Sequence, residues 1–185
     1  MKKIFTIILY SISLMIIAQP PLSYNEIIKV DSVSKAILFE RARSWYNESF
    51  KSSQHILNIQ DKETGELSGN AIMEYKPEVF RGNNQTKGII RFIVTIKVKD
   101  GKYRYEFTNF THEGSRSITS YGNVSASSFG LITITDTCSH SDFKGYQNWK
   151  NKVWADIKMQ INANILPMIE TLKVKMNQSA KLDSW

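Results

Sequence analysis

Alternation of apolar and polar residues over positions 90–107 is the clearest structural pattern in the chain. The apolar positions are Ile90, Phe92, Val94, Ile96 and Val98 before the Asp100-Gly101 pair, and Tyr103, Tyr105 and Phe107 after it. This pattern predicts two half-buried antiparallel strands joined by a two-residue type I′ turn. The turn fixes the register, so Val98 is expected opposite Tyr103, with Ile96 and Val94 opposite the next two aromatic residues.

Further strands and two helices are predicted on either side of this hairpin. The pattern predicts strands over 24–30, 54–60 and 67–75, a helix over 33–47, and a helix from 146 with the apolar stripe Trp149, Val153, Ile157, Ile161, Ile165, Met168 and Leu172. In the strand over 54–60, the side chains of His55, Leu57 and Ile59 are expected on one face. A helical stripe buries one side of a helix, so Trp45 and Trp149 are expected to anchor the two helices in the core. Pro167 is expected to kink or break the second helix, because proline lacks a backbone N–H.

The first eighteen residues have the features of an export signal. Lys2 and Lys3 precede an apolar run over 4–18, which ends before Gln19-Pro20-Pro21. A basic start and an apolar run shorter than the roughly 20 residues of a membrane span are typical of a secretory signal peptide. We expect cleavage near Ala18, with an uncleaved anchor as the alternative. The predicted division is a signal peptide (1–18), a domain core (19–112), a Ser/Thr/Gly-rich loop segment with a strand-like run at 131–137 (113–145), a C-terminal helix that completes the domain (146–178) and a tail (179–185).

Composition narrows the classes of function. The chain has 185 residues, of which 24 are basic, 17 are acidic and one is cysteine. A single cysteine excludes an internal disulfide and a cysteine-rich zinc module. The net charge of +7 is too low in density for a nucleic-acid-binding arm, and export removes most nucleic-acid partners. No catalytic, cofactor-binding or metal-binding motif stands out, so we expect a protein that is not an enzyme.

Four segments between Val30 and His112 carry a resemblance to a known family. They are the helix over 35–45 with Phe50, the Lys51-Ser52-Ser53 stretch, the turn over 61–65 and the long hairpin motif over 97–110. In these residues the chain resembles an exported bacterial family of unknown function with a fold like that of the TATA-binding protein (TBP). The resemblance implies an α+β fold, with a curved antiparallel sheet in β-α-β-β-β-β-α order and helices packed on one face. It also implies a location in the periplasm or cell envelope of a Gram-negative, Bacteroidetes-type bacterium. It implies no activity, and the name of a fold is no evidence for DNA binding.

Five basic residues of the predicted hairpin form the main candidate binding site: Arg91, Lys97, Lys99, Lys102 and Arg104. Because side chains alternate across a strand, these five are expected on the open face of the sheet. Lys99 opposite Lys102 is an unfavourable like-charge pair, and a cost retained at one place can signal an anionic partner, either an envelope protein or an anionic glycan or lipid head group. The alternative is a solvated face whose lysines prevent edge-to-edge pairing.

Two other functions stay open. One is a carrier of a small amphipathic ligand between the sheet and the helices, which a closed apolar cavity would favour. The other is a hydrolase with a site near His140, beside Cys138 and Asp142. Neither His55 nor His112 has a recognisable ligand pattern around it, so Cys138 is interpreted as a lone free thiol in a loop. Trp154 lies off the apolar stripe of its helix, which leaves a partner contact open at this position.

Overall fold

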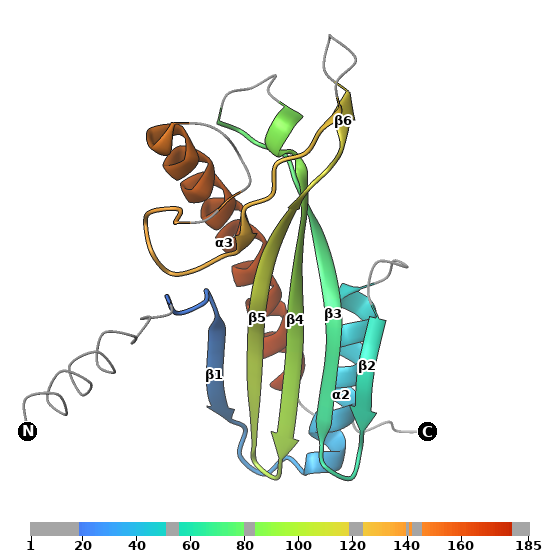
Figure 1. Cartoon of the computed structure of the whole chain (residues 1–185). Helices are drawn as coiled ribbons and strands as arrows, with labels where there is room; N and C mark the ends of the chain where they lie inside the picture. The colour runs from blue at the N-terminus through green and yellow to red at the C-terminus, as the bar shows by residue number, and fades with distance from the viewer. Residues whose placement is uncertain are drawn as a thin grey trace, which may run out of the picture.

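A long antiparallel sheet backed by two helices forms the protein in the computed structural model, which describes residues 19–50, 56–79, 84–118, 124–139, 141 and 146–178 (Figure 1). The strands are β1 (Tyr24–Lys29), β2 (Ile56–Asp61), β3 (Glu66–Tyr75), β4 (Gly88–Lys99), β5 (Lys102–Gly114), and the short β6 (Ser117–Ile118), β7 (Val124–Ser125) and β8 (Gly130–Leu131). The helices are α2 (Lys35–Ser49) and α3 (Gln147–Met176), with a 3₁₀ turn η1 (Asn84–Thr86). The main sheet has the order β1-β5-β4-β3-β2, and β8 pairs with β5. The predicted α+β fold is therefore confirmed.

The hairpin of β4 and β5 has the predicted register. Val98 lies opposite Tyr103, Ile96 opposite Tyr105 and Val94 opposite Phe107, and all six side chains are buried. The predicted turn type is wrong, because type I′ needs a positive φ at both central residues and only Gly101, with φ +71°, has one. Asp100 instead accepts the backbone N–H of Lys35 at 2.7 Å through its carboxylate. The turn is thus shaped by its contact with the start of α2.

Two tryptophans hold the helices to the rest of the core. Trp45 is 2% exposed and Trp154 is 0% exposed. The indole N–H of Trp154 donates to the carbonyl of Thr135 at 2.8 Å, and that of Trp45 donates to Thr171 Oγ1 at 3.0 Å. The prediction for Trp45 is confirmed, whereas Trp149 is only half-buried. The expectation of a partner contact at Trp154 is wrong, because the segment around Thr135 covers the side of α3 that the sheet leaves free.

That covering segment is part of the stretch predicted to be loop-like. Phe129, Ile132 and Cys138 are buried in the same core as the helices. The strand-like run expected over 131–137 is mostly absent, because β8 ends at Leu131 and only an isolated bridge from Pro21 to Thr133 follows. The segment therefore contributes packing to the domain rather than a regular strand.

Two local expectations differ from the observed backbone. A register shift between Leu57 and Ile59 places these two residues of β2 on opposite faces, and Ile59 is 45% exposed; His55 lies outside the described residues. Helix α3 runs through Pro167 without a break. Pro167 and Ala163, whose carbonyl the proline cannot bond, are both exposed, so water can satisfy that carbonyl.

Alkaline pH is expected to destabilise the fold through Tyr46. Its hydroxyl is buried without a hydrogen-bond partner among the described residues, and burial raises the pKa of Tyr46 to about 12. The unfolded chain would lose this proton near the ordinary pKa of about 10, so the free energy of unfolding should fall as pH rises from about 10 to about 12. Urea unfolding at several pH values measures this fall, and Tyr46→Phe should reduce it. Equal pH dependence in both proteins would contradict the prediction.

Candidate functional site

The face of the sheet turned away from α2 and α3 is not covered by either helix (Figure 1). The side chains that face the helices come from alternate positions, such as Val94 and Ile96, and are fully buried. The intervening positions form what we call the open face. The structure places all five candidate basic residues there, each exposed to solvent: Arg91, Lys97, Lys99, Lys102 and Arg104.

Three of these five basic residues have carboxylate partners on the same face. Lys97 pairs with Glu66 at 3.0 Å and Arg104 pairs with Glu106 at 2.5 Å. Arg91 donates from Nε to Glu113 at 2.8 Å. The open face is therefore not a uniformly basic strip, and these exposed pairs contribute little to stability.

The remaining two lysines lie beside a third one, which the pattern of the hairpin alone does not reveal. Lys102 lies opposite Lys99 of β4 and also opposite Lys29 of β1. All three are exposed, and none forms an ion pair with a residue that the structure describes. We call Lys29, Lys99 and Lys102 the lysine row. Like charges placed opposite each other in a sheet are unfavourable, so the row is a local concentration of unneutralised positive charge.

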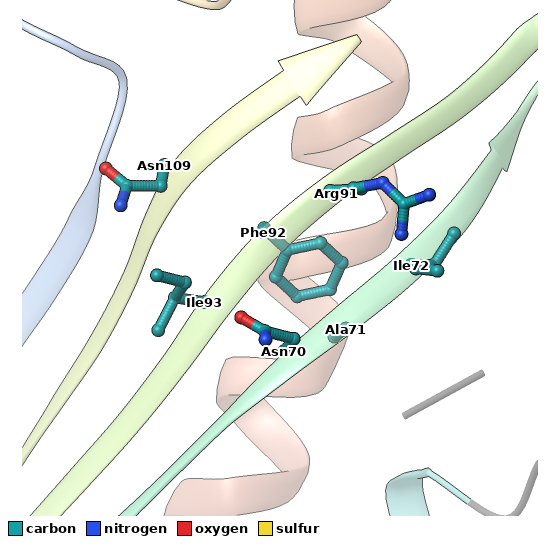
Figure 2. A pocket seen from close by; sticks show the side chains of 7 residues that line it. All are labelled: Asn70, Ala71, Ile72, Arg91, Phe92, Ile93 and Asn109. Atoms are coloured by element: carbon teal, nitrogen blue, oxygen red, sulfur yellow. The ribbon is translucent and has the colours of Figure 1, made fainter. Parts of the chain in front are cut away.

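A pocket of about 310 Å³ opens on the same face between β3 and β4 (Figure 2). Its lining residues are Asn70, Ala71, Ile72, Arg91, Phe92, Ile93 and Asn109. In the register of the two strands, Ile72 lies opposite Arg91 and Asn70 opposite Ile93. Ala71 and Phe92 lie opposite each other between these pairs, and their side chains are buried on the helix side. The walls are thus two cross-strand pairs, and Ala71 and Phe92 line the pocket between them.

A bulge in β5 supplies the last residue of this pocket. Between the pairs Ile93–Thr108 and Arg91–Thr111, strand β5 has one residue more than β4. Asn109 lies in this bulge with φ +58°, and its side chain is exposed. Asparagine tolerates this left-handed conformation better than most residues, and bulges re-aim side chains next to binding sites. We call the site the bulge pocket.

Glu113 holds the guanidinium of Arg91 from one side. The bond to Glu113 uses Nε, and the two terminal nitrogens have no hydrogen-bond partner within the described part of the chain. Figure 2 shows the guanidinium of Arg91 extending from β4 toward Ile72 on β3, at one end of the bulge pocket. The two terminal nitrogens of the Arg91 guanidinium are therefore available at the edge of the bulge pocket, which is small and partly apolar.

His112 and Cys138, the histidine and the cysteine that the structure describes, form no such site. His112 is fully buried; Phe129 N–H donates to its Nδ1 at 3.1 Å, and its Nε2 lies 2.9 Å from the Thr86 carbonyl, to which it donates. Cys138 is buried and not in a disulfide. No cluster of potential metal ligands occurs among the described residues. His140 and Asp142 lie outside the described residues, so the hydrolase alternative stays an expectation.

Comparison with known proteins agrees with this architecture. An antiparallel sheet with two helices behind it defines an α+β protein of TBP-like fold. Residues 24–113 match the model of the family described as "Domain of unknown function (DUF4468) with TBP-like fold", in agreement with the resemblance seen in the sequence. Among curated proteins, none matches the chain.

Two solved structures from Bacteroidetes have similar folds. A TBP-like protein from Parabacteroides distasonis is 12% identical, with a TM-score of 0.55 over 83% of this chain and 93% of that one. A DUF4468 family protein from Bacteroides ovatus is 11% identical, with a TM-score of 0.53 over 87% of this chain and 89% of that one. At such identities the likeness extends to the fold alone.

Proposed function

We propose that this protein is an exported, non-enzymatic binding module of the bacterial cell envelope, and that it binds an anionic partner on the open face of the sheet. The lysine row carries this proposal. It presents three exposed lysines side by side without a carboxylate partner among the described residues, on a face that neither helix covers. Their mutual repulsion costs stability, and an anion bound across the row would relieve it. The location is supported by the signal-like composition of residues 1–18 and by the bacterial origin of the similar structures.

The packing between sheet and helices argues against the carrier alternative. Leu38 of α2, Phe107 of β5 and Ile157 of α3 are each 0% exposed. They belong to one continuous core cluster between the layers. A small amphipathic ligand would need space that these side chains fill, and the bulge pocket opens on the opposite face of the sheet.

No helix in the described part of the chain is long and apolar enough to span a membrane.

Charge reversal in the lysine row is expected to weaken partner binding without unfolding the protein. Lys99→Glu with Lys102→Glu should reduce capture of an anionic envelope component by about tenfold or more at low salt, because two attractive charges become repulsive. The reduction should be smaller at higher salt, since exposed charges act only within about 10 Å at 0.1 M salt. Thermal stability should stay within about 0.5 kcal/mol of the parent, as for most surface changes. Affinity capture from envelope extracts, with each captured component quantified by mass spectrometry, measures the effect.

The matched control is Lys87→Glu with Lys150→Glu, which changes the net charge equally. Neither lysine forms an ion pair within the described residues, and neither lies in the lysine row. Components lost with the row variant but retained with the control would support the proposal. If both variants lose the same components, or neither loses any, the lysine row is a solvated face and the binding proposal is wrong.

A further inference from the structure

We propose that the bulge pocket binds the free carboxylate at the end of a short peptide. The inference rests on the proposed binding function of the open face, and it names the chemical group that one part of this face recognises. The bulge pocket and the lysine row are separate places on this face. Arg91 borders the pocket, whereas Lys99 and Lys102 lie next to the turn that joins β4 and β5.

The guanidinium of Arg91 is arranged to receive a carboxylate. Glu113 accepts from Nε at 2.8 Å, which restricts the rotation of the planar group. The two terminal nitrogens then offer N–H groups that Glu113 does not use, and such a fork matches the two oxygens of a carboxylate. Glu113 also cancels part of the positive charge. A singly charged carboxylate therefore fits the site better than a phosphate group, which carries nearly two negative charges.

The remaining lining residues of the bulge pocket suit the last one or two residues of a bound peptide. Asn70 and Asn109 line the pocket, and their side-chain amides have no hydrogen-bond partner among the described residues. The amide of Asn70 extends from β3 toward β4, whereas that of Asn109 extends from β5 to the side away from β4 and lies at the margin of the site (Figure 2). Each amide offers both a donor and an acceptor, as a peptide group requires. Ile72 and Ile93 supply apolar wall for a small aliphatic side chain (Figure 2). A volume of about 310 Å³ is at the lower end for ligand sites, so one or two residues fill it.

The composition of the open face argues against flat ring ligands. None of its side chains contributed by β3 and β4 is aromatic, since Phe92 is buried on the helix side. A nucleobase would lack a surface on which to stack. The positive φ of Asn109, +58°, adds a second indication. Such a conformation is unfavourable for a residue other than glycine and is often retained at binding sites. Here it lies in a residue that lines the pocket, although Figure 2 shows the amide of Asn109 extending from β5 to the side away from β4.

Nuclear magnetic resonance titration of the mature protein with N-acetyl-alanyl-alanine tests the proposal. We expect shifts of backbone amide signals in residues 70–72, 91–93 and 109, and binding about tenfold tighter than that of the same dipeptide with an amidated end. Equal binding of the acid and the amide, or shifts elsewhere on the protein only, would overturn the proposal. Glucuronate serves as a second probe: tighter binding of glucuronate than of the dipeptide at the same residues would overturn the assignment to a peptide.

Two arginine variants separate this site from the rest of the open face. Arg91→Gln should abolish the preference for the acid over the amide, while Arg104→Gln should keep it. Arg104 is a matched control because it is equally exposed on the same face and also pairs with a glutamate. Thermal unfolding verifies that both variants fold. A preserved acid preference in Arg91→Gln would contradict the inference, and it would leave the lysine-row proposal standing, since that proposal is tested by reversal at Lys99 and Lys102.

Discussion

Replacing Trp154 with alanine is expected to lower the free energy of unfolding by about 3–5 kcal/mol, the usual cost of removing a buried tryptophan. The side chain is 0% exposed, so its removal leaves a large cavity under the segment that contains Thr135. The indole N–H donates to the carbonyl of Thr135 at 2.8 Å, and without it that carbonyl would keep only the bond from Lys158 Nζ at 3.0 Å. Urea unfolding followed by tyrosine fluorescence or circular dichroism measures the loss.

Trp149→Ala is the matched control on the same helix. Trp149 is only half-buried, so less apolar surface returns to water and the expected loss is below about 2 kcal/mol. A loss at Trp149 that equals or exceeds the loss at Trp154 would show that the helix is anchored at its first turn. It would also show that the cover over Trp154 contributes little to stability.

Sequence periodicity predicts one buried side of α3 correctly and misses the other. The stripe from Val153 to Leu172 identified the side of α3 that packs on the sheet, and its members Val153, Ile157, Ile161, Ile165 and Leu172 are fully buried. A second buried side of the helix exists because residues 129–138 pack against it. Periodicity along a single helix cannot reveal this, because a long-range contact with an irregular segment leaves no repeating pattern in the sequence.

The open face was predictable in part. Alternation and the two-residue turn placed Lys97, Lys99, Lys102 and Arg104 together, since these features act within one hairpin. Lys29 was missed because the pairing of β1 with β5 joins residues more than seventy positions apart in the sequence. The carboxylates that neutralise part of the face were also missed. Glu66 reaches Lys97 from the neighbouring strand β3, whose register with β4 no turn signal fixes.

The bulge pocket left a weak signal in the sequence. Alternation in β5 is regular as far as Phe107, after which the buried positions are Phe110 and His112, one residue out of phase with the earlier strand. Asn109 occupies the point of the shift. Asparagine is depleted in strands and enriched at left-handed positions, so an asparagine at a phase change predicts a bulge. The pocket itself depends on the pairing with β3 and could not be predicted from β5 alone.

His112→Phe is expected to destabilise the protein by about 2–5 kcal/mol, because it leaves two buried backbone groups without partners. The imidazole accepts from the N–H of Phe129 at 3.1 Å and donates to the carbonyl of Thr86 at 2.9 Å, which joins β5 to two segments far apart in the chain. Phenylalanine keeps an aromatic ring beside Tyr75, whose ring centroid lies 5.1 Å from that of the imidazole, but its six-membered ring is larger, so overpacking of the buried site adds to the loss. The variant therefore removes both hydrogen bonds and keeps an aromatic ring in the site.

Chemical unfolding measures the loss, and hydrogen exchange at the amide of Phe129 locates it. Thr108→Val, on the open face of the same strand, serves as the control and should change stability by no more than about 0.5 kcal/mol. A loss below about 1 kcal/mol in His112→Phe, with unchanged exchange at Phe129, would mean that the two hydrogen bonds contribute little. The histidine would then be a candidate for chemistry rather than for structure. The expected loss instead assigns His112 to holding residues 129–138 against the sheet, the same cover that buries Trp154.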